Sequence, residues 1–209
     1  MNIPRVITLP VGQLRSNCYI YHTSPTEALV VDPGDDSDFV NQKLLDLELT
    51  PQAILITHGH FDHVMGAFGV QSAFNCPVYI HQDDDFLLQR MRETAIHFTE
   101  VDPGPPPLIT HYFSTEESIT IGDLQVTLIK TPGHTPGSLS FYDSKNHVVF
   151  IGDIFFADGS TGGVDHSYSD KNTLRNSIIK ISELPDDTMV YPGHGSSLSI
   201  RQYKNVLTF

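Results

Sequence analysis

The sequence predicts a layered α/β protein, with β-sheets inside and helices outside. Three observations support this prediction. Short apolar runs alternate with turn residues such as Asp32-Pro33-Gly34, other segments repeat their apolar residues at helical spacing, and both kinds occur in both halves of the chain. The 209 residues suffice for one large domain or two small ones and can bury a sizeable core.

In the first half, the expected strands are short apolar runs bounded by turn signals. They lie at 18–23, 27–32, 53–57 and 77–81. Helices are expected at 36–48, where the apolar residues recur at near-helical spacing, and at 64–75, despite two glycines in that segment.

A second half is expected to begin near residue 113. Its strands lie within 118–130, 138–153 and 188–195, joined by tight turns, and a helix is expected at about 170–184. The segment 101–111 contains four prolines in seven residues, which excludes a helix or a central strand. We interpret it as a rigid connector between the halves, with a loop lining a substrate cleft as the alternative.

Composition narrows the class of protein. The formal net charge of −13 disfavours nucleic-acid partners, because an acidic surface repels phosphates. No run approaches the roughly 18 apolar residues of a membrane span, and the N-terminus lacks the apolar core of a secretory signal, so a cytoplasmic protein without a membrane partner is expected. Cys18 and Cys76 are isolated and are expected to be small buried thiols.

The stretch THGHFDHVMG (57–66) places His58, His60, Asp62 and His63 within six positions. Two residues apart on an extended exit from a strand, the first two histidines point the same way. The aspartate and the third histidine begin a helix, where neighbours diverge by about 100°. The stretch can therefore offer ligands to two adjacent points, and imidazole with carboxylate suits zinc, iron or manganese. A cluster of packed neutral histidines is the less economical alternative.

Two metal ions need more ligands than these four. His134, Asp153 and His194 each follow a predicted strand and are each preceded by glycine, which lets the backbone turn sharply and approach a metal closely. Strand ends are also where α/β proteins place their chemistry.

The pattern HxHxDH, followed by His, Asp and His, resembles the metallo-β-lactamase superfamily. Within it, the chain looks most like the short, single-domain relatives of glyoxalase II, the hydroxyacylglutathione hydrolases. The turn Asp32-Pro33-Gly34 and the segment TPGHTPGSLSFY (131–142) carry the same resemblance, which covers nearly the whole chain. It implies an α/β fold of the αββα sandwich type, with two mixed sheets flanked by helices in a single domain, 1–209, and a dinuclear site along one edge.

The resemblance also implies the roles of the site residues. The ligands of the first ion would be His58, His60 and His134, and those of the second Asp62, His63 and His194. Asp153 would bridge the two ions, and Asp32 would orient a ligand imidazole. Two divalent ions are expected, with zinc preferred over iron or manganese.

The expected reaction is hydrolysis of a small-molecule thioester. Two bound ions would supply a hydroxide at neutral pH to attack the carbonyl, and the thiolate would leave with little need for protonation. Asp62 and Asp153 are the expected catalytic residues, the former as a ligand that could also accept a proton. The alternatives are a mononuclear-iron persulfide dioxygenase, a lactonase, and a metal-binding interaction protein with a vestigial site. The oligomeric state is left open.

The chain departs from its relatives after Asp153. They carry G-S-x-G-R-x-D, whereas this chain reads GSTGGVDHSYSD (159–170), with Gly163 at the basic position. That basic group helps glyoxalase II to hold glutathione, so weaker glutathione binding is expected here. His166 and Tyr168 lie in the same segment and could hydrogen-bond a substrate, with a surface loop as the alternative.

Overall fold

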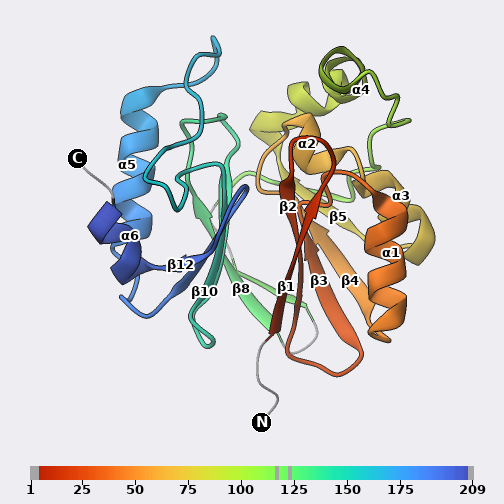
Figure 1. Ribbon diagram of the computed structural model, residues 1–209, viewed down its shortest axis with the longest axis horizontal. Helices are drawn as coiled ribbons and strands as arrows, with labels where there is room; N and C mark the ends of the chain where they lie inside the picture. The colour runs from red at the N-terminus through yellow and green to blue at the C-terminus, as the bar shows by residue number, and fades with distance from the viewer. Residues whose placement is uncertain (1–4, 116–117, 122–123, 207–209) are drawn as a thin grey trace.

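The structure, a computed structural model, describes residues 5–115, 118–121 and 124–206. Two six-stranded sheets pack face to face, and helices cover the outer face of each sheet (Figure 1). Within each sheet the strands follow one another in chain order, and each sheet contains both parallel and antiparallel pairs. The expected sandwich of two mixed sheets flanked by helices is confirmed.

The strands of the first sheet are β1 (Arg5–Val11), β2 (Ser16–His22), β3 (Glu27–Val31), β4 (Thr50–Leu55), β5 (Val78–His81) and β6 (His111–Phe113). Those of the second sheet are β7 (Ser118–Ile121), β8 (Leu124–Lys130), β9 (Leu139–Asp143), β10 (Val148–Gly152), β11 (Met189–Pro192) and β12 (Leu198–Ser199). The helices are α1 (Ser37–Asp46), α2 (Phe61–Val64), α3 (Ala67–Phe74), α4 (Asp85–Thr99), α5 (Lys171–Ser182) and α6 (Ile200–Val206), with a 3₁₀ turn, η1 (Gln82–Asp84). In Figure 1, α1 and α3 flank the first sheet, and α5 and α6 flank the second.

Strand β3 explains why the two layers hold together. Leu29 and Val31 belong to the core between the sheets, whereas Ala28 and Val30 belong to the core between the first sheet and its helices. This alternation follows from the two-residue period of a strand, and a strand buried on both faces reads as an unbroken apolar run. Burying each larger side chain contributes about 1.5–3 kcal/mol. The sheets therefore form a firm base from which the loops of the site emerge.

The prediction of a single helix at 64–75 is wrong. The helical segment starts earlier, at Phe61, and breaks at Met65 and Gly66 into α2 and α3. A Cβ added to Gly66 would lie 2.8 Å from the carbonyl oxygen of Pro33 and 2.9 Å from that of Asp35. The glycine thus allows the loop after β3 to pass directly against the break, which keeps α2 as a separate short turn.

Helix α4 has no counterpart among the expected elements. Its buried residues, Leu88, Met91, Ala95 and Thr99, recur every three or four positions, so one face packs although most of the segment is polar. The proline-rich segment leads from α4 to β6, the last strand of the first sheet. Its expected role as a connector between the halves is therefore wrong, because the crossover to the second sheet comes after β6.

Cys18 and Cys76 are buried and free, as expected. Burial raises the pKa of both thiols, so neither is a ready nucleophile at neutral pH. Among the described residues, no helix combines the length and the apolar character needed to cross a bilayer.

Candidate metal centre

The histidine-rich stretch forms the loop and the first helical turn that follow β4. His58 and His60 lie on the loop, and Asp62 and His63 lie on α2. The ring of His58 has its centroid 4.8 Å from that of His60 and 4.3 Å from that of His63. His58 therefore lies between two groups of ligands, as a loop that turns directly into a helix can arrange.

His58, His60 and His134 form a first cluster of candidate ligands. One ring nitrogen of each lies within 4.8 Å of the others, and Nε2 of His134 is 2.9 Å from Nδ1 of His60. His134 follows β8, so the cluster joins the two sheets. Nε2 of His58 is buried and has no hydrogen-bond partner. Three converging imidazole nitrogens form a suitable site for one transition-metal ion.

Asp62, His63 and His194 form a second cluster. Oδ2 of Asp62 lies 3.6 Å from Nε2 of His63 and 3.3 Å from Nε2 of His194. His194 follows β11, and its backbone forms an isolated bridge with Ser16 of the first sheet. This cluster, like the first, is thus assembled from both sheets.

Asp153, which follows β10, lies between the clusters. Its Oδ1 is 3.5 Å from Nε2 of His63, while its Oδ2 is 3.8 Å from Nε2 of His134 and 3.6 Å from Nε2 of His194. One carboxylate therefore faces ligands of both clusters.

The separations between the donor atoms suit coordination of a divalent metal ion better than they suit direct hydrogen bonds. Ligands at about 2.0–2.2 Å from a tetrahedral ion lie about 3.3–3.6 Å apart, close to the separations around Asp62 and Asp153. Nε2 of His63 and Oδ1 of Asp153 are also buried without a hydrogen-bond partner. Such atoms cost stability when left unsatisfied, and coordination of a cation satisfies them.

The two clusters differ in charge. Burial, together with the neighbouring His63, lowers the pKa of His58 far below its usual range, so this imidazole is neutral. Burial opposes a charge on His63 as well, but the carboxylates of Asp62, Asp153 and Asp32 outweigh it and raise the pKa of His63 to about 10. A metal ion entering the second cluster must therefore displace a proton, whereas the imidazoles of the first are ready donors.

Asp32 holds one ligand ring in position. Its Oδ2 accepts hydrogen bonds from Nδ1 of His63 at 3.1 Å and from the hydroxyl of Thr57 at 2.6 Å, and its Oδ1 accepts the backbone N–H of Thr57 at 2.7 Å. Although it also lies close enough to His58 and His63 to form a third possible ligand set, its oxygens are engaged by these bonds. This leaves Nε2 of His63 directed at the second cluster, the arrangement that an orienting residue requires.

Asp84, in η1, is a site residue that the sequence analysis missed. Its carboxylate accepts the backbone N–H groups of Gly59 at 2.8 Å and Gly137 at 2.7 Å, and the hydroxyl of Thr135 at 2.7 Å. These bonds tie the loop of the histidine-rich stretch to the loop that carries His134. Burial raises the pKa of Asp84 to about 6. The only local signal is a run of three aspartates, which does not single out the middle one.

The segment after Asp153 lies beside the first cluster. The hydroxyl of Tyr168 is 2.9 Å from Nε2 of His60, and the ring of His166 stacks on Tyr168 with centroids 4.9 Å apart. The carbonyl of Gly163 accepts a hydrogen bond from Nδ1 of His134 at 2.8 Å, and a Cβ added to Gly163 would meet nothing within 4 Å. His166 and Tyr168 are thus at the site, while position 163 has room for a side chain.

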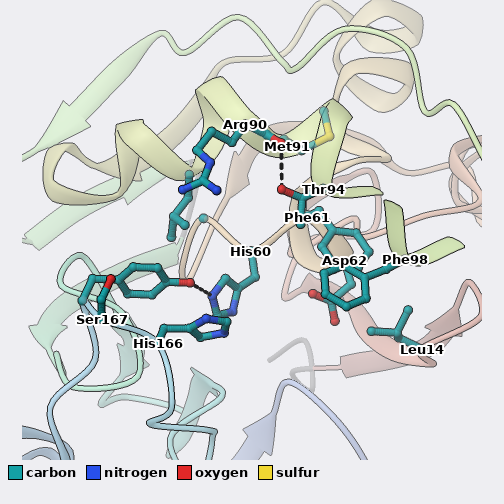
Figure 2. Close-up of a pocket in the computed structure, with 13 residues that line it drawn as sticks. Leu14, His60, Phe61, Asp62, Arg90, Met91, Thr94, Phe98, His166 and Ser167 are labelled. Carbon is teal, nitrogen blue, oxygen red and sulfur yellow. Dashed lines mark hydrogen bonds between the residues drawn. The ribbon is translucent and has the colours of Figure 1, made fainter. Parts of the chain in front are cut away.

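A cleft of about 470 Å³ opens beside His60 and Asp62 (Figure 2). Much of its lining is apolar and comes from the loop after β1, from α2 and from α4. Its polar lining includes Arg90, His166 and Tyr168. The proline-rich segment contributes no lining residue, so the alternative expectation for that segment is wrong for this cleft.

Residues 11–194 match the sequence profile of the metallo-beta-lactamase superfamily. The chain belongs to this superfamily. The resemblance to this superfamily is therefore confirmed. Three of the candidate ligands, His134, Asp153 and His194, lie just after strands of this chain.

Two relatives within the superfamily match nearly the whole chain. The probable metallo-hydrolase YqgX of Bacillus subtilis is 32% identical over 194 residues, which cover 92% of this chain and 90% of the relative. Hydroxyacylglutathione hydrolase GloC of Haemophilus influenzae is 31% identical over 201 residues, which cover 94% of this chain and 93% of the relative. Together with the site, they indicate a metal-dependent hydrolase.

Two crystal structures show the same metallo-beta-lactamase fold over nearly the whole length of the chain. BLEG-1, a B3 metallo-beta-lactamase, is 35% identical, with a TM-score of 0.89 and coverage of 96% of this chain and 97% of that one. TTHA1623, solved in a di-iron-bound form, is 30% identical, with a TM-score of 0.86 and coverage of 96% and 98%. The superfamily and the donor clusters together imply that divalent metal ions bind here.

Proposed function

We propose that this protein hydrolyses a small-molecule thioester with two divalent metal ions, in the manner of glyoxalase II. The observation that carries the proposal is the position of Asp153 between the two clusters. A carboxylate that faces both donor sets supports a pair of ions that share it. The likeness to GloC, which is named a hydroxyacylglutathione hydrolase, supports the thioester as the substrate class.

The first cluster would hold one ion and the second cluster the other, with Asp153 between them. When bound, the ions would supply a hydroxide at neutral pH and polarise the substrate carbonyl. We propose zinc, because imidazole and carboxylate donors suit it. Iron is the competing choice, given the di-iron form of TTHA1623.

Asp62 and Tyr168 would act on the substrate side of the site. Although burial opposes it, His63 and His194 hold the pKa of Asp62 below its usual range, so its carboxylate is ionised and can accept a proton. Burial raises the pKa of Tyr168, which keeps its hydroxyl protonated. If Nδ1 of His60 is the ligand atom, its Nε2–H donates to the oxygen of Tyr168, whose own proton is then free to reach the substrate.

The leaving group favours a thioester. A thiolate needs little protonation as it departs, which suits a cleft in which burial raises the pKa of Tyr168 and makes its hydroxyl a weak acid. Cyclic amides are the second candidate class, and the observation that favours them is the likeness to the B3 metallo-beta-lactamase BLEG-1.

A substrate panel tests the proposal. Protein reconstituted with zinc, and separately with iron, would be assayed with S-lactoylglutathione, an acetyl thioester, an aliphatic lactone, nitrocefin, and glutathione persulfide with oxygen uptake as the readout. We expect thiol release from thioesters to exceed every other activity. Opening of nitrocefin or the lactone alone, or oxygen uptake with one bound iron, would overturn it. Metal-free protein is the control for background hydrolysis.

A further inference from the structure

The cleft beside the metal centre is apolar at one end. The rings of Phe61 and Phe98 are stacked, with centroids 5.7 Å apart and planes at 2°, and Figure 2 shows Leu14 on the same side. Phe98 is 64% exposed and Leu14 is 43% exposed. Large apolar side chains left open at a catalytic cleft offer a surface on which an apolar part of a ligand can be buried.

The opposite end carries a cation. Arg90, on α4, lines the cleft, and Figure 2 shows its guanidinium on the same side as Ser167 and His166. Within the described part of the chain, no carboxylate lies at ion-pairing distance from it. Arg92 on the same helix differs, since it forms two hydrogen bonds, at 2.8 Å and 2.6 Å, to the carboxylate of Asp102. Arg90 is therefore available to an anion from solution, even though the chain carries a net charge of −13.

The metal-centre residues lie between these ends. Figure 2 places His60 and Asp62 between Arg90 and His166 on one side and Leu14 on the other. A scissile bond held at the metal centre would extend its two arms toward opposite ends. A guanidinium binds a carboxylate through two parallel hydrogen bonds, which makes the carboxylate the anion that this end would take.

We propose that the cleft selects thioesters that carry an apolar group on one side of the carbonyl–sulfur bond and a carboxylate on the other, the carboxylate being bound by Arg90. This inference rests on the proposed function. It also provides a cation where Gly163 lacks one, from a helix rather than from the segment after Asp153. Phe61 and Phe98 would contact the apolar arm, which a lactoyl group does not fill.

Two isomeric substrates test the selection. They are the 3-phenylpropanoyl thioester of 3-mercaptopropionate and the succinyl thioester of phenylethanethiol, each compared with its methyl ester. For the better isomer, we expect kcat/KM of the free acid to exceed that of its methyl ester by at least about tenfold. The ester loses the charge-assisted hydrogen bonds that Arg90 would donate to the carboxylate. Arg90→Gln should abolish this preference, and Arg90→Lys should keep part of it. In the better isomer, Phe98→Ala should reduce the advantage of the phenyl-bearing arm over a methyl group at the same position.

Arg92→Gln is the matched control, since it removes the same charge from the same helix outside the cleft and should leave the preference unchanged. An unchanged preference in Arg90→Gln would overturn the proposal. The thioether 3-(3-phenylpropylthio)propanoate cannot be hydrolysed, so its binding, measured by calorimetry, tests the Arg90 subsite separately from the proposed function. Binding that weakens at least about tenfold in Arg90→Gln supports the subsite even if no thioester is hydrolysed. Hydrolysis that ignores Arg90 supports the function and rejects the subsite.

Discussion

Oδ1 of Asp153 lies 3.5 Å from Nε2 of His63, and both atoms are buried without a hydrogen-bond partner. The separation is too long for a good hydrogen bond but suits two ligands of one ion. On its other side the same carboxylate faces His134. The occupancy of both candidate sites should therefore depend on this one side chain.

Asp153→Ala is expected to abolish hydrolysis and to lower metal occupancy at both sites, from two ions per chain in the parent protein. Elemental analysis after dialysis and steady-state kinetics would measure the two effects. Asp38→Ala, an exposed change on α1 with the same loss of charge, is the control. Two retained ions with normal turnover would contradict the bridging position.

Asp32→Asn is expected to weaken binding of the ion held by His63 by about 10- to 100-fold, because a neutral amide orients the ring less firmly. Competition with a chromogenic chelator measures the affinity, and Asp38→Asn serves as the control. Parent-like affinity would show that the hydrogen bond from His63 is dispensable for coordination.

Metal binding is expected to release protons. Below the raised pKa of His63, about 10, its imidazole carries a proton that the ion must displace, so affinity at this site increases as the pH rises toward that value. Although burial opposes it, Asp62 and Asp153 also raise the pKa of His194, so both imidazoles of the second cluster are mostly protonated at about pH 6. A metal-bound water with a pKa of about 7 is largely intact at that pH, so calorimetric titration in buffers of different ionisation enthalpy should give more than one and up to about two protons per ion at this cluster. Binding without proton release would contradict the charge assigned to His63.

Asp84→Asn is expected to lower the free energy of unfolding by about 1–3 kcal/mol, because an amide cannot accept all three buried hydrogen bonds. Looser loops should also weaken metal binding at the first cluster. Denaturant unfolding and chelator competition measure these effects. Asp83→Asn is a suitable control, since the adjacent side chain is exposed. If both variants behaved alike, Asp84 would have no positioning role.

Gly163→Arg is expected to lower the KM for S-lactoylglutathione more than tenfold, corresponding to about 1.5–3 kcal/mol, while leaving kcat nearly unchanged. The added group should strengthen substrate binding equally in the ground and transition states, and a Cβ at this position meets no other atom. Steady-state kinetics on both proteins would decide. A micromolar KM in the parent would contradict this prediction, because it would mean that cations already present bind both carboxylates of glutathione.

The superfamily and the candidate ligands could be predicted from the sequence because they depend on short-range order. The spacing of His58, His60 and His63 follows from the local directions of side chains on a strand exit and a helical turn. The strand ends that carry Asp153 and His194 are marked by an apolar run and a glycine. These are properties of a few consecutive residues, so the amino-acid sequence alone reveals them.

Asp84 and Arg90 could not be found in this way, since their surroundings come from distant parts of the chain. Asp84 bonds to Gly59, 25 residues before it, and to Gly137, 53 residues after it. Arg90 lies on α4, whose mostly polar sequence offered no clear sign that one face of the helix is buried. Arg90 lines the cleft only because α4 packs beside α2. The sequence by itself determined the metal-binding chemistry and the layered fold. Only the tertiary structure decided which carboxylate joins the loops and which cation lines the cleft, because both depend on long-range packing that no local pattern encodes.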